Sequence, residues 1–441
     1  MCKVRVIGAG LAGSEAAWQI AKLGVDVELC EMKPKRYSPA HHSEGFAELV
    51  CSNSLRSADP ANAVGLLKEE LRLLGSLIME AAVASSVPAG SALAVDRNRF
   101  SAYITERLTS HPRITIRNEE ITELDDEVIT VVASGPLTDG ALAEAIGRLT
   151  GGDSLSFYDA AAPIVDFSTV DTSIAYFATR YGKGNPDDYL NCPMTKEEYD
   201  AFYQALISAK EAELKEFDAA MQGKELTVFE GCMPVEVMAR RGYDTLRFGP
   251  MKPVGLPHPE TGEEAYAVVQ LRRENREGTM YNLVGFQTHL TFGEQKRVFS
   301  MIPGLANAEF LRYGVMHRNT YLRSPGMLSF DYSMVSRPNL FFAGQMTGVE
   351  GYVESAGSGF VAGINAAKLF LGEEPLVYSE ETMLGAMAGY VSRGGVGDFV
   401  PMNANFGILK ELGYRVKGGK VAKYEKLAER SLAEVERLLK E

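Results

Sequence analysis

Cysteine is scarce in this sequence, and long apolar runs are absent. The 441 residues include only five cysteines, an odd number at wide spacing and without a C-x-x-C pair. This pattern argues against a disulfide framework and against a cysteine-rich zinc site, so we expect reduced thiols and no metal. No apolar stretch approaches the roughly 18 residues of a membrane helix, and the opening MCKVRVIGAG predicts a strand rather than a signal peptide. We therefore predict a cytoplasmic protein with no membrane span.

Positive charge is also in short supply, whereas glycine is abundant. Lys and Arg number 45 against 58 Asp and Glu, which gives a net charge of −13. Taken over the whole chain, this balance argues against a nonspecific binder of polyanions. Glycine accounts for 43 residues, more than the usual share of about 7%. The excess suggests segments where backbone closely approaches a ligand or other backbone.

The first glycine-rich segment has the order of a dinucleotide-binding unit. Val4 to Ile7 predicts a buried parallel strand, Ser14 to Leu23 predicts a helix, and Val25 to Leu29 predicts a second strand that ends at Glu31. The sequence GAGLAG lies between the first strand and the helix. A lone G-x-G-x-x-G is weak evidence, but this context and the acid at the expected spacing make it strong.

Each residue of this motif has a predicted task. Gly8 allows a tight turn, Gly10 lets the backbone approach a pyrophosphate, and Gly13 lets the helix pack closely on the strand. The N–H groups from Leu11 to Ser14 face the phosphates at the positive end of the helix dipole, and Glu31 is placed to accept hydrogen bonds from ribose. The predicted cofactor-binding residues here are Gly8, Ala9, Gly10, Leu11, Ala12, Gly13 and Glu31.

A second glycine-rich segment, more than 300 residues later, favours FAD over NAD as the dinucleotide. It follows an apolar strand at 339–343 and begins with Gly344 and Gln345, which we predict to bind FAD. A helix of small residues follows from Glu354 to Leu371. Such a late strand–glycine–helix unit is typical of proteins that reach the flavin end of FAD from a distant part of the chain.

The predicted fold class is α/β, with a discontinuous Rossmann-type FAD-binding domain and an inserted α+β domain. Residues 1–160 alternate helices and strands and form the first part of the FAD-binding domain. Residues 161–320 are rich in short strands, Pro turns and aromatics, and form the insertion. Residues 321–441 form the second part of the FAD-binding domain and a charged C-terminal helix. Within these regions we predict single helices over 62–84, 196–217 and 410–441.

Two cysteines lie in contexts that suggest chemistry. Cys51 lies in ELVCSNSL, and Cys232 lies in VFEGCMPVEV. Pro234 has the character of a first helical residue, so Cys232 would lie at a helix N-terminus, where the dipole favours a thiolate. A lone cysteine is more often a small buried hydrophobe, and Cys2, Cys30 and Cys192 keep that interpretation.

Several motifs together resemble one family. They are GAGLAGSEAAW, FAELVCSNSL, VPAGSALAVDR, YLNCPMT, FEGCMPVEVMARRG, FGPMKPVGL, GFQTHL, EQKRVFSMIPGL, RYGVMHRNTY and GVEGYVESAGSGF. These segments resemble the folate- and FAD-dependent tRNA (uracil-5-)-methyltransferases, the TrmFO family, from the first strand to about residue 407. The late glycine motif is also similar to that of the GidA tRNA-modification family.

The resemblance implies a reaction, its cofactors and its catalytic residues. A cysteine thiolate adds to uracil C6, and C5 then attacks a carbon that methylenetetrahydrofolate has passed to N5 of reduced flavin. The resemblance assigns these roles to Cys232 and Cys51. The helix-start context favours Cys232 as nucleophile and Cys51 as acid or base, and the reverse assignment stays open. NAD(P)H is implied as the reductant of FAD, with no preference between NADH and NADPH, and His317 is implied to cover the pterin of the folate.

The implied product is ribothymidine in the T-loop of tRNA, with no obligatory protein partner. Two alternatives stay open: the same chemistry on ribosomal RNA, and a plain FAD-dependent oxidoreductase of a small molecule in which both cysteines only pack. An RNA substrate is compatible with the acidic balance, because phosphate contact needs only a few cations on one face. We therefore expect a basic face around the flavin cleft, drawn from Lys33, Lys35, Arg36, Arg240, Arg241, Arg247, Arg272, Arg273, Arg276, Lys296, Arg297 and the C-terminal helix.

Overall fold

The computed structural model describes residues 3–151, 154–212, 233–395 and 399–440. Its first sheet has six strands in the order β16-β17-β7-β1-β2-β6, parallel except for the antiparallel pair β16–β17. The strands are β1 (Val4–Ile7), β2 (Val27–Glu31), β6 (Ile114–Asn118), β7 (Thr130–Val132), β16 (Ser333–Met334) and β17 (Arg337–Phe342). Strands from both ends of the chain therefore share one sheet, as predicted for a discontinuous Rossmann-type domain.

Helices cover this sheet, and the two that follow the glycine segments cross each other closely. They are α1 (Leu11–Lys22) and α11 (Tyr352–Leu371). Gly359 and Gly363 of α11 lie directly against the backbone of Ala12 and Ala16 in α1. Gly359 and Gly363 of the late helix thus allow its close packing on α1. The remaining helices of this part are α2 (Ala63–Leu73), α3 (Leu77–Ala84), α4 (Arg97–Thr109), α5 (Gly140–Thr150), α12 (Met383–Arg393) and α13 (Gly419–Leu438).

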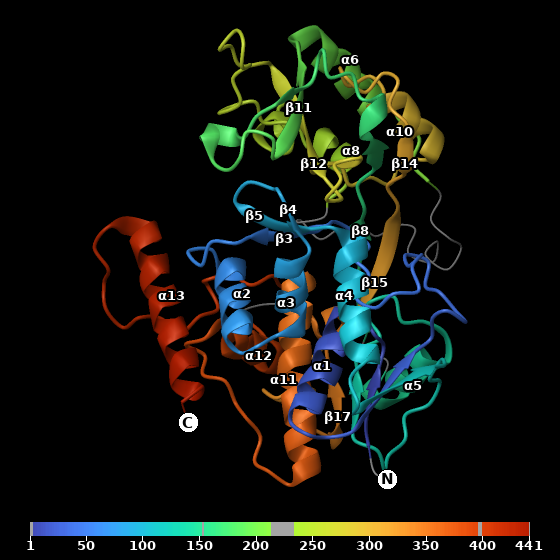
Figure 1. Ribbon diagram of the computed structural model, residues 1–441, viewed down its shortest axis with the longest axis vertical. Helices are drawn as coiled ribbons and strands as arrows, with labels where there is room; N and C mark the ends of the chain where they lie inside the picture. The colour runs from blue at the N-terminus through green and yellow to red at the C-terminus, as the bar shows by residue number, and fades with distance from the viewer. Residues whose placement is uncertain (1–2, 152–153, 213–232, 396–398, 441) are drawn as a thin grey trace.

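The second sheet lies at the upper end of the molecule in Figure 1 and has its own apolar core. Its order is β10-β11-β12-β13-β9-β14, with every neighbouring pair antiparallel. Its strands are β9 (Ile164–Asp166), β10 (Tyr176–Phe177), β11 (Tyr189–Met194), β12 (Ala267–Arg273), β13 (Met280–Leu283) and β14 (Phe310–Arg312). Helices α6 (Lys196–Ile207), α8 (Val235–Arg240), α9 (Thr245–Phe248) and α10 (Phe292–Phe299) accompany them, with short 3-10 turns η1 (Phe167–Thr169) and η2 (Arg180–Gly182).

Two smaller sheets lie between these parts. Strands β8 (Ser154–Ala160) and β15 (Met316–Leu322) pair antiparallel, so the chain enters and leaves the second sheet side by side. A three-stranded sheet contains β3 (Ser54–Ser57), β5 (Ala92–Val95) and β4 (Ser86–Val87). The α/β fold with an inserted α+β part is thus confirmed, while the boundaries at 160/161 and 320/321 stay predictions.

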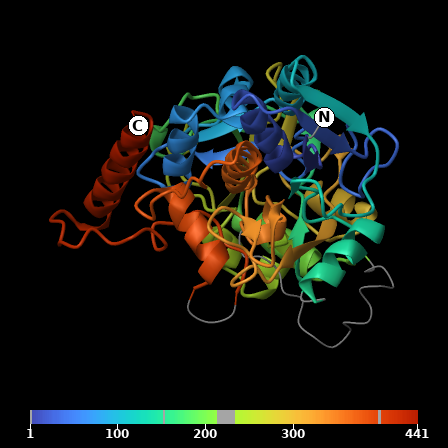
Figure 2. The ribbon, with the colours of Figure 1, turned by 90° about the horizontal axis from the view of Figure 1, so that it is seen from below.

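Three predicted helices differ from the observed ones. Residues 62–84, predicted as one helix, form two helices. Helical structure is interrupted between them because Gly75 has a left-handed φ of 77° and the Ser76 side chain caps α3 by accepting from the Met79 N–H. Helix α6 ends at Ile207, well before residue 217. The C-terminal helix begins only at Gly419 and lies at one edge of the molecule, which Figure 2 shows clearly. Within the described residues, no helix combines the length and the apolar character that crossing a membrane requires.

The α1–α11 crossing provides a first prediction, about Gly359→Ala. A methyl group at Gly359 would overlap the carbonyl group of Ala12, and forced overpacking of this kind costs about 1–3 kcal/mol. The matched control is Gly147→Ala in α5, where the added methyl group meets open space and should stabilise by roughly 0.5–1 kcal/mol. Urea unfolding followed by circular dichroism compares the two. Equal midpoints for Gly359→Ala and the wild type would contradict the close packing.

Candidate active site

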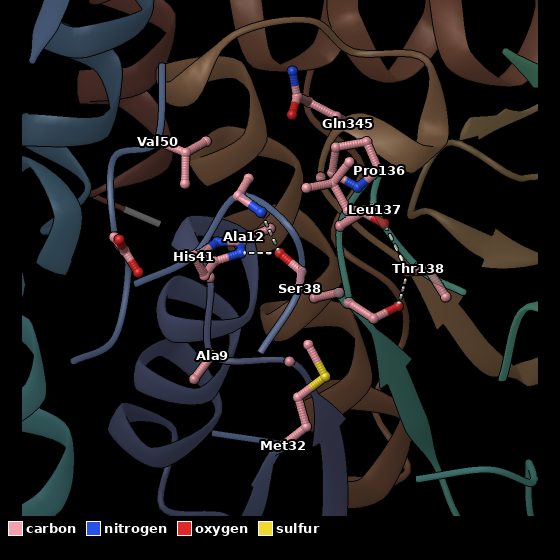
Figure 3. A pocket seen from close by; sticks show the side chains of 18 of the residues that line it. Ala9, Ala12, Met32, Ser38, His41, Val50, Pro136, Leu137, Thr138 and Gln345 are labelled. Carbon is pink, nitrogen blue, oxygen red and sulfur yellow. Dashed lines mark hydrogen bonds between the residues drawn. The ribbon is translucent and has the colours of Figure 1, made fainter. Parts of the chain in front are cut away.

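A pocket opens at the carboxyl ends of the first-sheet strands, where ligands of open α/β sheets bind. The glycine loop after β1, the end of β2, the loop after β7 and the loop after β17 all line it. Figure 3 shows Pro136, Leu137 and Thr138 on one side and His41 and Val50 on the other. Of the predicted residues, the pocket is lined by Gly8, Ala9, Gly10, Leu11, Ala12, Glu31, Cys51, Gly344 and Gln345.

The glycine loop has the geometry that its sequence predicts. Gly8 has a φ of 94°, and a methyl group there would lie 2.6 Å from the Ala133 carbonyl oxygen. Gly13 does not line the pocket, because it packs against the carbonyl of Gly8. A methyl group at Gly10 would meet only open space. No side chain of the described chain caps the start of α1, so the N–H groups of its first turn remain available to an anion.

Glu31 is buried and already has two backbone donors. Its carboxylate accepts from the Ala9 N–H at 2.8 Å and from the Lys33 N–H at 3.0 Å. These bonds fix the glycine loop to the end of β2. A carboxylate has further lone pairs, and Glu31 lines the pocket, so its contact with ribose stays a prediction.

His41 is a pocket residue that sequence reasoning missed. The pair His41-His42 is followed by Ser and Glu, a pattern typical of a solvated loop, yet the His41 ring faces the pocket in Figure 3 and lies 2.6 Å from the Ser38 hydroxyl. Burial lowers its pKa below the ordinary value, which favours the neutral ring. His42, by contrast, is exposed. Only Ser38, three residues upstream, could have signalled that His41 has a local partner.

Cys51 lies at the pocket wall on a segment whose backbone is held by a tyrosine. The Tyr352 hydroxyl, at the start of α11, accepts from the Cys51 N–H at 2.7 Å and the Ser52 N–H at 3.2 Å. The Cys51 thiol is partly exposed and donates to the Ala160 carbonyl at 3.6 Å. The late glycine segment thus positions the cysteine, a role that its sequence did not reveal.

Three arginines from α4, β12 and β14 also hold the Cys51 segment. Arg97 donates to the Leu49 carbonyl and to Glu274, Arg272 donates to Ser52 at 2.8 Å and Asn53 at 3.1 Å, and Arg312 donates to the Val50 carbonyl at 2.7 Å. Burial lowers the pKa of Arg272 and of Arg312. The expectation that Arg272 belongs to an exposed basic face is therefore wrong: its guanidinium is buried and braces the cysteine segment.

Other members of the expected basic face already form hydrogen bonds or ion pairs within the protein. The Lys33 ammonium is buried and donates to the Ser43 carbonyl at 3.1 Å. Arg36 pairs with Glu120 and Asp139, Arg247 with Asp244, and Arg297 with Glu294. Much of the positive charge expected on this face is thus paired or buried, and Lys296 of α10 is an exposed exception with no ion pair within the described residues.

Two predicted site residues are described incompletely or not at all. Cys232 lies outside the described residues, which resume at Met233. Helix α8 begins at Val235 with Pro234 as its N-cap rather than as its first helical residue. His317 lies on β15, with its backbone opposite Asp159 of β8. Asn319, two residues further along β15, lines the pocket, so this strand does reach the site.

Cys30 and Cys192 are expected to react poorly, so alkylation of the native protein should be selective for Cys51. Both are buried, and burial raises the pKa of each thiol to about 12. Because the thiolate is the reactive form, iodoacetamide at pH 7.5 should label Cys51 in the native protein and leave Cys30 and Cys192 unlabelled until urea is added. Peptide mass spectrometry reads each site. Labelling of Cys192 at the rate of Cys51 would contradict the observed burial.

The fold and the glycine-loop pocket define a protein of the Rossmann-type FAD-binding class. The family model described as Glucose inhibited division protein A matches residues 3–374. The chain is 59% identical over 422 residues to the methylenetetrahydrofolate--tRNA-(uracil-5-)-methyltransferase TrmFO of Acetivibrio thermocellus, covering 96% of this chain and 95% of that protein. It is 57% identical over 437 residues to TrmFO of Bacillus subtilis, covering 99% and 98%. The chain therefore belongs to the TrmFO group of the Glucose inhibited division protein A family.

A solved structure agrees on the fold. GidA of Aquifex aeolicus, in its form II crystal, superposes with a TM-score of 0.70 at 17% identity, covering 99% of this chain and 73% of that chain. At this identity the likeness concerns the fold alone.

Proposed function

We propose that this chain methylates C5 of a uridine in the T-loop of tRNA, with methylenetetrahydrofolate as carbon donor and with FAD and NAD(P)H. The observation that most directly supports the proposal is that one pocket joins a dinucleotide-type glycine loop to Cys51. The relatives at 57% and 59% identity carry this reaction in their names, whereas the structure alone would also suit a small-molecule flavoprotein.

The residues present fit an FAD. The uncapped start of α1 and the open space at Gly10 suit a pyrophosphate. Glu31 lines the same pocket, and we assign it to the ribose. Gly344 and Gln345 lie on the opposite loop, close to Tyr352 and Cys51 in the same lining. We place the flavin at this end. A bound flavin supplies the electrons and carries the one-carbon unit.

The cysteines act on the uracil ring. A thiolate that adds to C6 makes C5 nucleophilic, because the adduct is an enolate. We assign this addition to Cys232 and the removal of the C5 proton to Cys51, with the reverse order as the alternative. Tyr352 and the three arginines hold the segment that carries Cys51, and we assign His317 to the outer face of the pterin. The target uridine has to leave its base stack to reach these groups.

The decisive experiment supplies the protein with FAD, NAD(P)H, methylenetetrahydrofolate and an unmodified tRNA transcript. Ribothymidine in the digested RNA is the expected product, and omission of the folate should abolish it. Product with ribosomal RNA but not with tRNA would replace the proposed substrate. Flavin turnover without any modified RNA would replace the proposal with a small-molecule oxidoreductase.

A further inference from the structure

Three aromatic rings form a nearly parallel stack at the surface of the second sheet. Tyr313 lies between Phe292 and Phe310, with ring centroids 5.0 Å and 5.6 Å away and interplanar angles of 15° and 12°. Aromatic pairs in protein interiors adopt edge-to-face as well as offset-stacked arrangements, and the buried Phe286–Phe299 pair nearby crosses at 75°. Two successive nearly parallel contacts therefore arrange the three rings in layers, which we call the platform.

The outer ring of this platform is open. Phe292 is the first residue of α10, and 55% of its surface is exposed. Phe310 and Tyr313 are only partly exposed, so the stack is anchored at one end and free at the other. A large exposed aromatic ring with a rigid support beneath it is the arrangement by which proteins bind unstacked nucleobases.

Two lysines flank the free ring. Lys296 lies one helical turn beyond Phe292, on the same side of α10, and Lys210 precedes the platform, with its carbonyl accepting the Thr291 N–H at 3.1 Å. Both side chains are exposed, and neither forms an ion pair within the described residues. The nearest acid of α10, Glu294, is neutralised by Arg297 at 2.6 Å. The platform thus combines the exposed ring of Phe292 with two lysines whose charge suits contact with phosphates.

The platform is joined to the candidate active site through a few residues of chain. Arg312, next to Tyr313, donates to the Val50 carbonyl at the pocket wall. Three residues on, the Val315 carbonyl accepts from the N–H of Ala161, another lining residue. Figure 1 shows α10 beside β14, above β15, which carries this connection down to the first sheet. The platform and the pocket wall are therefore linked through one short segment of chain, residues 310–315.

We propose that the outer face of Phe292 stacks on an unpaired nucleobase of the substrate RNA near the target uridine, with Lys210 and Lys296 contacting the adjacent phosphates. The inference rests on the proposed function, because it assigns RNA as the occupant. The unstacking that brings the uridine to the cysteines leaves a neighbouring base without its partner, and the ring replaces that lost stacking.

The test uses the full chain loaded with FAD and an unmodified tRNA transcript. Base–aromatic stacking contributes about 1–3 kcal/mol, so Phe292→Ala should raise the Kd for tRNA about 5- to 150-fold. Phe292→Trp should stay within about twofold of the wild type, since it keeps the ring face. Phe370→Ala, an exposed phenylalanine at the far end of α11, is the matched control and should bind normally. Lys296→Ala should reduce the slope of log Kd against log salt by about 1.

The outcomes separate this inference from the proposed function. Wild-type protein that methylates tRNA, together with Phe292→Ala protein that binds it equally well, would overturn only the platform. Equal losses in Phe292→Ala and Phe292→Trp would also overturn it, because stacking would not explain them. A raised KM for methylenetetrahydrofolate with an unchanged Kd for tRNA would assign the ring to folate instead. Wild-type protein that neither binds nor methylates tRNA would remove the proposed function itself.

Discussion

Cys232→Ala protein is expected to keep its FAD but to form no detectable ribothymidine, a loss of at least about 10⁴-fold for removal of a nucleophile. Cys51→Ala should lose about 10²–10⁴-fold, the usual contribution of a general acid or base. Neither substitution alters a predicted cofactor contact, so flavin absorbance should be unchanged. The measurement is ribothymidine formation per bound flavin under saturating tRNA and folate.

Cys192→Ala is the matched control for both cysteine variants. Its thiol is fully buried in the core of the second sheet, so the change should lower stability while leaving turnover per folded molecule intact. A Cys51→Ala enzyme with wild-type turnover would show that Cys51 only packs. Full ribothymidine formation in both variants would remove the two cysteines from the reaction, whereas flavin turnover that is unaffected in both variants and yields no modified RNA would favour the small-molecule oxidoreductase.

The order of the two cysteine roles can be resolved with a tRNA that carries 5-fluorouridine at the target. In this tRNA, fluorine replaces the C5 hydrogen that the base would remove. The thiolate then cannot be eliminated, so the enzyme stays covalently attached through its nucleophile. Cys51→Ala should still form a denaturation-resistant complex, and Cys232→Ala should form none. The opposite pattern would establish Cys51 as the nucleophile.

The structure shows which parts of the site are local in sequence. The β1–loop–α1–β2 unit could be predicted because its signals, a strand, three glycines and an acid, occupy consecutive residues. Gly344 could be predicted because the same pattern recurs before α11. These segments meet in one pocket, since parallel strands direct their carboxyl ends to the same edge of the sheet.

The support of Cys51 could not be predicted, because it depends on long-range contacts. Tyr352 reaches Cys51 across 301 residues, and Arg272 reaches Ser52 across 220. In the sequence, Arg272 is adjacent to Arg273, and two consecutive arginines suggest exposed surface residues. Only the fold shows that β12 carries Arg272 into a buried position against the cysteine segment. The helix break at Gly75 was missed for a different reason, since the apolar periodicity continues across it.

Gly10→Val is expected to abolish FAD retention without unfolding the protein. Gly10 has φ −72° and ψ −169°, an extended conformation that valine adopts readily, so the backbone tolerates the change. The added side chain would fill the open space beside the start of α1, where we place the pyrophosphate. Loss of two charge-assisted hydrogen bonds at about 1.5–3 kcal/mol each would weaken FAD binding roughly 10²–10⁴-fold.

The control for Gly10→Val is Gly147→Val, the same substitution at a glycine that also faces open space but lies on α5, outside the pocket lining. It should retain FAD at wild-type stoichiometry, measured by flavin absorbance after gel filtration. Gly10→Ala should fall between the two, because a single methyl group intrudes less. Circular dichroism checks that all three variants fold. A folded Gly10→Val protein with full flavin content would place the pyrophosphate elsewhere, and Glu31 would then lose its assignment to the ribose, because that assignment rests on its spacing from this glycine loop.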